Sequence, residues 1–216
     1  MNKTDLKLYA ITDRQWLHGA RLSEHVKLAI EGGATMIQIR DKDILSTDCN
    51  AGLKDEYNEA LEIKRICHEH KVPLIINDNV QFAIDIDADG VHLGQDDMNP
   101  AEARKLLGTD KIIGVTAKTV EQAKAAEAGG ADYLGVGAMY PTDTKSDTSQ
   151  VTVETLKAIC RAVDIPVVAI GGIRADRIQP LKGTGADGVA VVSAIFGQPD
   201  IEAAARRLKE TAEMYL

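Results

Sequence analysis

Short apolar stretches rich in β-branched residues alternate with longer amphipathic stretches along the chain. Such alternation predicts βαβ units that build a parallel sheet. Eight strands are expected, at Leu6–Thr12, Met36–Arg40, Pro73–Asn77, Gly90–Gly94, Ile112–Thr116, Tyr133–Met139, Pro166–Ile170 and Gly188–Ser193. Helical periodicity predicts helices at Ser23–Ile30, Tyr57–His70, Pro100–Leu107, Val120–Ala128, Val153–Val163 and Ile201–Tyr215.

A similar sequence precedes every second predicted strand: EGGATMIQI, DADGVHLG, AGGADYLGVG and TGADGVAVV. The glycine is expected to take the left-handed conformation that closes the preceding helix. A repeat of two strand–helix units predicts a closed, pseudo-symmetric (β/α)₈ barrel. An open doubly wound sheet, which would alternate in the same way, is the second candidate. No linker divides the chain, so residues 1–216 are expected to form one domain.

The net charge limits the classes of partner that the chain is expected to bind. There are 25 basic and 33 acidic side chains, which gives a net charge of −8, and no dense run of Lys or Arg offsets it. Nucleic acid and anionic membranes are therefore poor partners. Aromatic residues make up only 4% of the chain, which argues against a base-stacking platform. A small anionic ligand would need local help from basic side chains, backbone N–H groups or a metal.

The cysteines indicate the compartment. Cys49, Cys67 and Cys160 are widely spaced, and no C-x-x-C occurs, so a disulfide framework or a zinc site is disfavoured. The first apolar segment is too short and polar for a signal peptide, and no apolar run approaches the roughly 18 residues of a membrane span. These features predict a cytoplasmic protein.

Polar residues gather at the ends of the predicted strands, where the chemistry of a (β/α)₈ barrel lies. Gln38, Arg40 and Lys42 occupy alternate positions at the end of the second strand, so they share one face. In a small barrel that face points inward, which predicts two cations near the barrel mouth. The alternative is a solvated strand end.

Carboxylates follow two neighbouring strands. Asn77 and Asp78 come directly after the third strand, and Asp96 and Asp97 follow the fourth. Oxygen ligands without a Cys/His cluster favour Mg²⁺ over zinc. Helix N-capping is the alternative interpretation of each Asp.

The ends of three further strands carry residues that suit phosphate binding. The loop YPTDTKSDTS after the sixth strand carries hydroxyls and Lys145, although its composition also fits a mobile surface loop. Gly171-Gly172 after the seventh strand and Ser193 after the eighth lie where phosphate-binding barrels hold phosphate. His92, inside the fourth strand, is interpreted as a hydrogen-bonded packing residue rather than a catalytic base.

These residues predict two binding sites for anionic ligands at the barrel mouth, one for a diphosphate with a metal and one for a simple phosphate. No nucleophile–base pair stands out. The pattern suits a reaction in which a diphosphate leaves, because the protein then mainly orients the partners and stabilises the departing charge.

The motifs LYAITD, QIRDK, LIINDN, ADGVHLGQDD, IIGVTA, GADYLGVGAMYPTDTK, VVAIGGI and GADGVAVVSAI occur in that order between about Leu8 and Phe196. Together they resemble the successive signatures of the thiamine phosphate synthase family. The resemblance implies an enzyme that joins an aminopyrimidine methyl diphosphate to a thiazole phosphate, giving thiamine phosphate and diphosphate. It implies a dissociative reaction, in which diphosphate departs and the thiazole nitrogen captures a pyrimidine-methyl cation.

The resemblance also implies roles for single residues. Asp78 and Asp97 would bind Mg²⁺, and Arg40, Lys42 and Lys145 would be the catalytic cations. The pyrimidine diphosphate would contact Gln38, Arg40, Lys42, Asn77, Thr116 and Lys145, and the thiazole phosphate Thr142, Asp143, Thr144, Gly172, Val192 and Ser193. Asp41 is included among the substrate-binding residues, although strand alternation turns it away from the site.

Three departures from the family pattern are visible. Thr116 stands where the family commonly has Ser, Asp41 replaces the commoner Glu, and the stretch Ile44–Glu56 is longer than usual. Two rivals remain: a thiazole tautomerase of the same barrel type, and a non-catalytic sensor of a thiamine precursor. The tautomerase is disfavoured because its relatives carry a His where this chain has Thr116-Ala117-Lys118. A homo-oligomer is one arrangement that the sequence allows.

Overall fold

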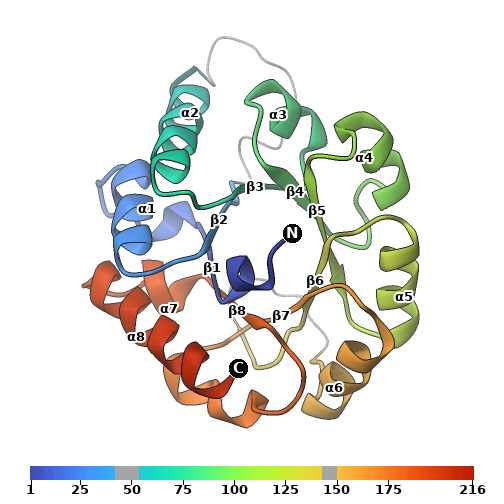
Figure 1. The fold of residues 1–216 in the computed structure, drawn as a ribbon. Helices are drawn as coiled ribbons and strands as arrows, with labels where there is room; N and C mark the ends of the chain where they lie inside the picture. Colours follow the sequence, from blue (N-terminus) through green and yellow to red (C-terminus); the bar gives the residue numbers. More distant parts are fainter. Residues whose placement is uncertain (42–53, 143–149) are drawn as a thin grey trace.

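The computed structural model describes residues 1–41, 54–142 and 150–216. Within them, eight parallel strands pair in sequence order and close into a barrel (Figure 1). Parallel pairing of β1 with β8 closes the barrel, with Tyr9 opposite Ala190. The prediction of a (β/α)₈ barrel is therefore confirmed, and the open-sheet alternative is wrong. The strands are β1 (Leu8–Ile11), β2 (Met36–Ile39), β3 (Leu74–Asn77), β4 (Gly90–Leu93), β5 (Ile112–Ala117), β6 (Tyr133–Val136), β7 (Val167–Ile170) and β8 (Gly188–Val191).

Helices surround the barrel (Figure 1). They are α1 (Leu22–Glu31), α2 (Lys54–Glu69), α3 (Val80–Asp85), α4 (Pro100–Leu107), α5 (Val120–Ala128), α6 (Val153–Ala162), α7 (Ser193–Phe196) and α8 (Ile201–Tyr215). Short 3₁₀ helices are η1 (Lys3–Leu6), η2 (Arg14–Trp16), η3 (Ala175–Arg177) and η4 (Gln179–Leu181). The six predicted helices are confirmed, whereas α3 and α7 were not predicted because each is too short to show a helical period.

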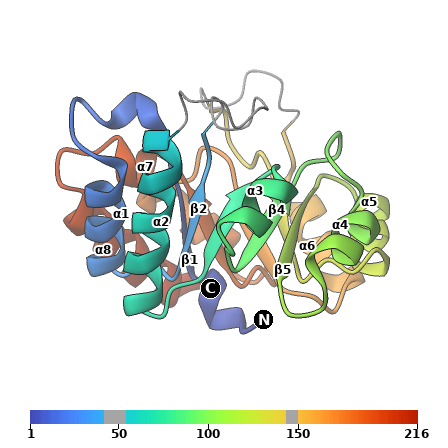
Figure 2. The same cartoon turned by 90° about the horizontal axis from the view of Figure 1, so that it is seen from above.

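Strand alternation divides the core into two clusters. Side chains on one face of each strand pack against the helices, and those on the other face fill the barrel. Leu6 of η1 belongs to the cluster inside the barrel. Figure 2 shows η1 and both chain termini at one end, so η1 closes the amino-terminal end of the barrel and the opposite end is the mouth.

The residue just before each even-numbered strand forms two hydrogen bonds with the start of the preceding odd-numbered strand. Leu8 N donates to Thr35 Oγ1 at 2.9 Å, and Thr35 N donates to Leu8 O at 2.8 Å. The same reciprocal clamp joins Leu74 with Asp89, Ile113 with Asp132 and Val167 with Asp187. The clamp explains why each sequence repeat places a Thr or an Asp just before the strand.

The repeated glycines close a preceding helix in two of the four repeats, at Gly33 after α1 and Gly130 after α5, whereas Gly185 takes the left-handed conformation without ending a helix. Gly33, Gly130 and Gly185 have φ of 105°, 88° and 94°. The expectation is wrong in DADG, where Asp87 takes the left-handed conformation with φ 52°. Gly90 is instead the first residue of β4. Glycine is required there because a Cβ would be 2.1 Å from the carbonyl oxygen of Ile112.

Candidate active site

A chain of hydrogen-bonded side chains crosses the inside of the barrel. Gln38 Nε2 on β2 donates to the Tyr9 hydroxyl at 2.5 Å, and that hydroxyl lies 2.9 Å from the Tyr133 hydroxyl. The Tyr133 hydroxyl lies 3.0 Å from His92 Nδ1, and His92 Nε2 lies 3.0 Å from Thr116 Oγ1. This interior chain therefore connects two predicted substrate contacts, Gln38 and Thr116, through strands on opposite sides of the barrel.

Two glycines make room for the interior chain. A Cβ on Gly114 would lie 2.1 Å from the ring of Tyr133, and a Cβ on Gly135 would lie 3.1 Å from His92 Cε1. Burial raises the pKa of Tyr9 and of Tyr133, so both phenols stay neutral hydrogen-bonding groups near pH 7. The hydrogen-bonded interpretation of His92 is confirmed.

Tyr9 and Tyr133 were not identified from the sequence. Each lies inside an apolar strand, where an aromatic residue is most simply interpreted as packing. The available signal was their inward register together with a hydroxyl that must find a partner when buried.

Arg40 is held at the end of β2 by the loop that follows β1. Its backbone N donates to Thr12 Oγ1 at 3.1 Å, and its Nη1 lies 3.7 Å from Asp13 Oδ2. The side chain of Arg40 is only 10% exposed. A mostly buried cation therefore lies at the mouth, next to Gln38 along the strand face, as the alternation predicts.

Asp41 faces the other way. Its carboxylate is paired with Arg14 Nε, and Arg14 Nη2 also lies 3.0 Å from Glu59 Oε2 on α2. The structure therefore does not bring Asp41 together with Gln38 and Arg40, and a substrate contact by Asp41 has no geometric support.

The two predicted metal ligands lie at the carboxyl ends of β3 and β4, which are neighbours in the barrel. Asp78 Oδ2 accepts from Asn77 Nδ2 at 2.5 Å, and Asp97 Oδ2 accepts from Gly94 N at 2.6 Å. Helix capping does not explain either residue, because the caps of α3 and α4 are Asn79 and Asn99.

The donor set of this pair suits a hard cation. Both carboxylates are oriented by neutral N–H donors, and only oxygen is offered to an ion, which fits Mg²⁺. Among the residues that the structure describes, no group of three or more His, Cys, Asp or Glu side chains forms a metal cage. A cation here would therefore complete its shell with water and substrate oxygens, which is usual for Mg²⁺.

The predicted phosphate cradle lies between the ends of β7 and β8. Gly171 and Gly172 have φ of 97° and 62°, and a Cβ on Gly172 would lie 2.5 Å from Pro141 O. The Gly172 carbonyl accepts from Arg177 Nη1 at 2.9 Å, while Tyr140 donates its hydroxyl to Arg177 O at 2.9 Å. The glycine turn is thus fixed against the segment after β6, beside the strand whose end leads through Val192 into Ser193 of α7.

Some predicted residues fall outside the described part of the chain. They are Lys42, Asp143, Thr144 and Lys145, together with Cys49 and most of the stretch Ile44–Glu56. Thr142 is half-buried at the end of a described segment.

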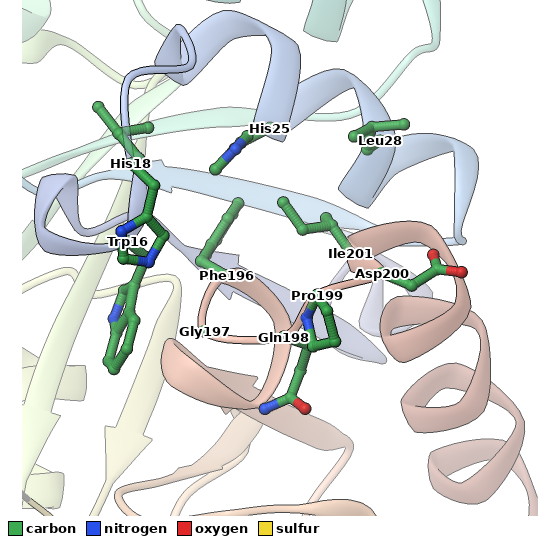
Figure 3. Close-up of a pocket in the computed structure, with 11 residues that line it drawn as sticks. Trp16, His18, His25, Leu28, Phe196, Gly197, Gln198, Pro199, Asp200 and Ile201 are labelled. Carbon is green, nitrogen blue, oxygen red and sulfur yellow. The ribbon is translucent and has the colours of Figure 1, made fainter.

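A separate cavity of about 630 Å³ lies beside α1, between the residues after η2 and the connection from α7 to α8 (Figure 3). Trp16, His25 and Phe196 are among its lining residues. Trp16 Nε1 and His25 Nδ1 are buried without a hydrogen-bond partner among the described residues. None of the predicted site residues lines this cavity, so it is distinct from the barrel mouth.

In the described ranges, no helix is long and apolar enough to cross a membrane.

Comparisons with known proteins identify the family of this chain. A family model described as thiamine monophosphate synthase matches residues 8–195. The chain is 48% identical to a thiamine-phosphate synthase of Clostridium beijerinckii, over 96% of each chain. It is 47% identical to a thiamine-phosphate synthase of Ruminiclostridium cellulolyticum, over 97% of this chain and 96% of the relative. A solved structure of thiamine phosphate pyrophosphorylase from Pyrococcus furiosus superposes with a TM-score of 0.86 at 39% identity, covering 99% of this chain and 98% of the other.

Proposed function

Because the chain belongs to the thiamine monophosphate synthase family, we propose that it joins an aminopyrimidine methyl diphosphate to a thiazole phosphate, giving thiamine phosphate and diphosphate. The observation that supports the proposal is the arrangement of side chains at the mouth of the barrel. There the interior chain ends in Gln38 and Thr116, next to the buried Arg40 and the carboxylates at the ends of β3 and β4.

The pyrimidine diphosphate occupies the side of the mouth formed by β2 to β5. Gln38, Asn77 and Thr116 contact it, with their orientations supported by the interior chain and by the Asn77–Asp78 hydrogen bond. Arg40, Lys42 and Lys145 supply positive charge to the diphosphate. Asp41 is not part of this set, because its carboxylate is paired with Arg14.

Asp78 and Asp97 hold Mg²⁺ in this proposal. When bound, the ion neutralises charge on the departing diphosphate.

The thiazole phosphate occupies the side formed by β6 to β8. Its contacts in this proposal are Thr142, Asp143, Thr144, Gly172, Val192 and Ser193. The support is the fixed Gly172 turn, whose backbone conformation is held by Arg177 and Tyr140. The position between the seventh and eighth strand ends is the usual phosphate site of such barrels.

The chemistry divides between these two sides. The bond between the pyrimidine methylene carbon and the diphosphate oxygen breaks, and its electron pair leaves with the diphosphate. The thiazole nitrogen then donates its lone pair to the methylene carbon, so no proton has to be removed. The protein holds the two substrates in contact and stabilises the leaving charge with Arg40, Lys42 and Lys145.

We also place the protein in the cytoplasm in this proposal. Its support is that Cys67 and Cys160 are both free thiols.

A turnover assay tests the function. Purified protein is incubated with both substrates and Mg²⁺, and the product is oxidised to fluorescent thiochrome, with an EDTA-treated sample as control. Metal-dependent product is expected. Folded protein that binds the substrates without forming product would favour the sensor instead, and turnover of the thiazole alone would favour the tautomerase.

A further inference from the structure

Three consecutive residues of the loop after β1 each hold a different part of the end of β2. Thr12 Oγ1 accepts from the backbone N of Arg40 at 3.1 Å, and Asp13 Oδ2 lies 3.7 Å from the Arg40 guanidinium. Arg14 is paired with the carboxylate of Asp41. The first two contacts act on Arg40 itself, whereas the third acts on the opposite face of the strand end.

Arg14 also anchors this strand end to a helix. Its Nη2 lies 3.0 Å from Glu59 Oε2 on α2. The other carboxylate oxygen of Glu59 accepts from the backbone N of Leu22, the first residue of α1, at 2.9 Å. Arg14 therefore ties Asp41 to a fixed point shared by two helices.

Both carboxylates that pair with Arg14 are buried. Asp41 is 5% exposed and Glu59 is 9% exposed, so a partner charge is needed to hold either carboxylate ionised without a large desolvation cost. The two acids raise the pKa of Arg14, although burial opposes them, so the guanidinium stays charged.

Asp41 lies between Arg40 and Lys42 in the chain, which are two of the proposed diphosphate contacts. We propose that Arg14 is a positioning residue: by pairing with Asp41 and Glu59 from behind the strand, it fixes the strand end that presents Arg40 to a diphosphate. This inference rests on the proposed function.

The test measures binding directly, so that it does not depend on turnover. Isothermal calorimetry would give the affinity for inorganic diphosphate in Mg²⁺ and, separately, the affinity for the thiazole phosphate. Arg14→Met removes the charge, and Arg14→Lys keeps it. Arg14→Met/Asp41→Asn/Glu59→Gln removes the cation and both carboxylates, so that neither carboxylate is left buried without its partner if the single variant fails to fold; it is called the combined variant. Arg21→Met is the matched control, because it breaks the exposed Arg21–Glu62 ion pair to the same helix α2.

We expect Arg14→Met and the combined variant to bind diphosphate at least about tenfold more weakly, with thiazole phosphate affinity within about twofold of wild type. Arg14→Lys should recover part of the loss, and Arg21→Met should bind both ligands as wild type does. Wild-type diphosphate affinity in the combined variant, or an equal loss for both ligands, would overturn the role of Arg14. A wild-type protein that binds diphosphate but makes no product would reject the proposed function and leave the role of Arg14 in place; one that binds no diphosphate would reject both.

Discussion

The hydroxyl of Tyr133 occupies the middle of the interior chain, between the Tyr9 hydroxyl and His92 Nδ1. It is fully buried, and the missing side chain of Gly114 provides the space for its ring. A buried polar group must keep its partners, since leaving one unsatisfied costs more than a typical hydrogen bond contributes. One oxygen atom therefore supports the orientations of side chains on several strands.

Tyr133→Phe removes that oxygen, so that Tyr9 and His92 each lose one of their hydrogen-bond partners. We expect the free energy of unfolding to fall by about 1–3 kcal/mol, measured by urea denaturation. Tyr140→Phe is the matched control, because its half-buried hydroxyl makes a single hydrogen bond, to Arg177 O. Equal losses in the two variants would show that the interior chain contributes no more than an ordinary hydrogen bond.

Asp78→Ala addresses the proposed metal ligand. We expect turnover to drop by about 10² or more, the scale of losing one preorganised electrostatic group. Steady-state assays over a range of Mg²⁺ concentrations measure it, and Asp96→Ala, an exposed neighbour of Asp97, is the control. Near-normal activity of Asp78→Ala at low Mg²⁺ would reject the metal assignment.

At the scale of the elements, the pairs of strands are joined by reciprocal clamps. Asp132 shows the most complete case: its Oδ2 accepts from Ile113 N at 2.7 Å and from Arg104 Nη2 of α4 at 2.5 Å. The same Arg104 donates to the carbonyl oxygens of Lys111 at 2.6 Å and Gly130 at 2.9 Å. One clamp thus fixes the start of β5, the turn before β6 and the helix α4.

Asp132→Ala removes the acceptor from both Ile113 N and Arg104. The expected loss in the free energy of unfolding is about 1–3 kcal/mol, because a half-buried backbone N–H is left unpaired. The exposed Asp110, on the loop just before β5, gives the control Asp110→Ala, which should change stability by no more than about 0.5 kcal/mol. Thermal unfolding by circular dichroism compares them, and a loss in Asp132→Ala no larger than in the control would contradict the clamp.

Most of the elements could be predicted from the sequence because strand and helix patterns alternate clearly. All eight strands were located, with ends differing by a few residues. Helices α3 and α7 could not be predicted, since six and four residues do not establish a period.

The candidate site was predictable to a similar degree. Strand alternation gave the inward placement of Gln38 and the outward turn of Asp41. The roles of Tyr9 and Tyr133 could not be predicted, because they depend on two hydroxyls from distant strands meeting at 2.9 Å. The pairing of Arg14 with Glu59 likewise depends on how α2 packs, which no local pattern specifies.

For the whole molecule, the fold buries three acidic protons, on the two phenols inside the barrel and on the Cys67 thiol of α2. Burial raises the pKa of Tyr9 and Tyr133 above the ordinary value near 10, and that of Cys67 to about 12. The folded protein therefore keeps protons that the unfolded chain releases at alkaline pH. The stability from these groups is complete below about pH 8.5 for the thiol and about pH 10 for the phenols, and it is lost as pH rises toward the folded pKa values.

Urea denaturation from pH 7 to pH 11 should accordingly show the free energy of unfolding falling above about pH 8.5, and more steeply above about pH 10. In Tyr133→Phe the decline above about pH 10 should be shallower, because one of the two buried phenols is gone. A profile in the variant that parallels wild type would exclude Tyr133 as a source of the alkaline loss.

The reciprocal clamps also decide where the chain can be divided. Each clamp lies within one pair of strands, β1 with β2, β3 with β4, β5 with β6 and β7 with β8, and none joins β4 to β5. A cut between Leu107 and Ile112 would therefore keep both residues of every reciprocal clamp in one fragment, while Arg104 of α4 would contact Asp132 across the cut. A cut inside α3 would separate Leu74 from Asp89 and break one. Fragment complementation should thus succeed at the first position and fail at the second, as expected of a barrel assembled from two matching halves.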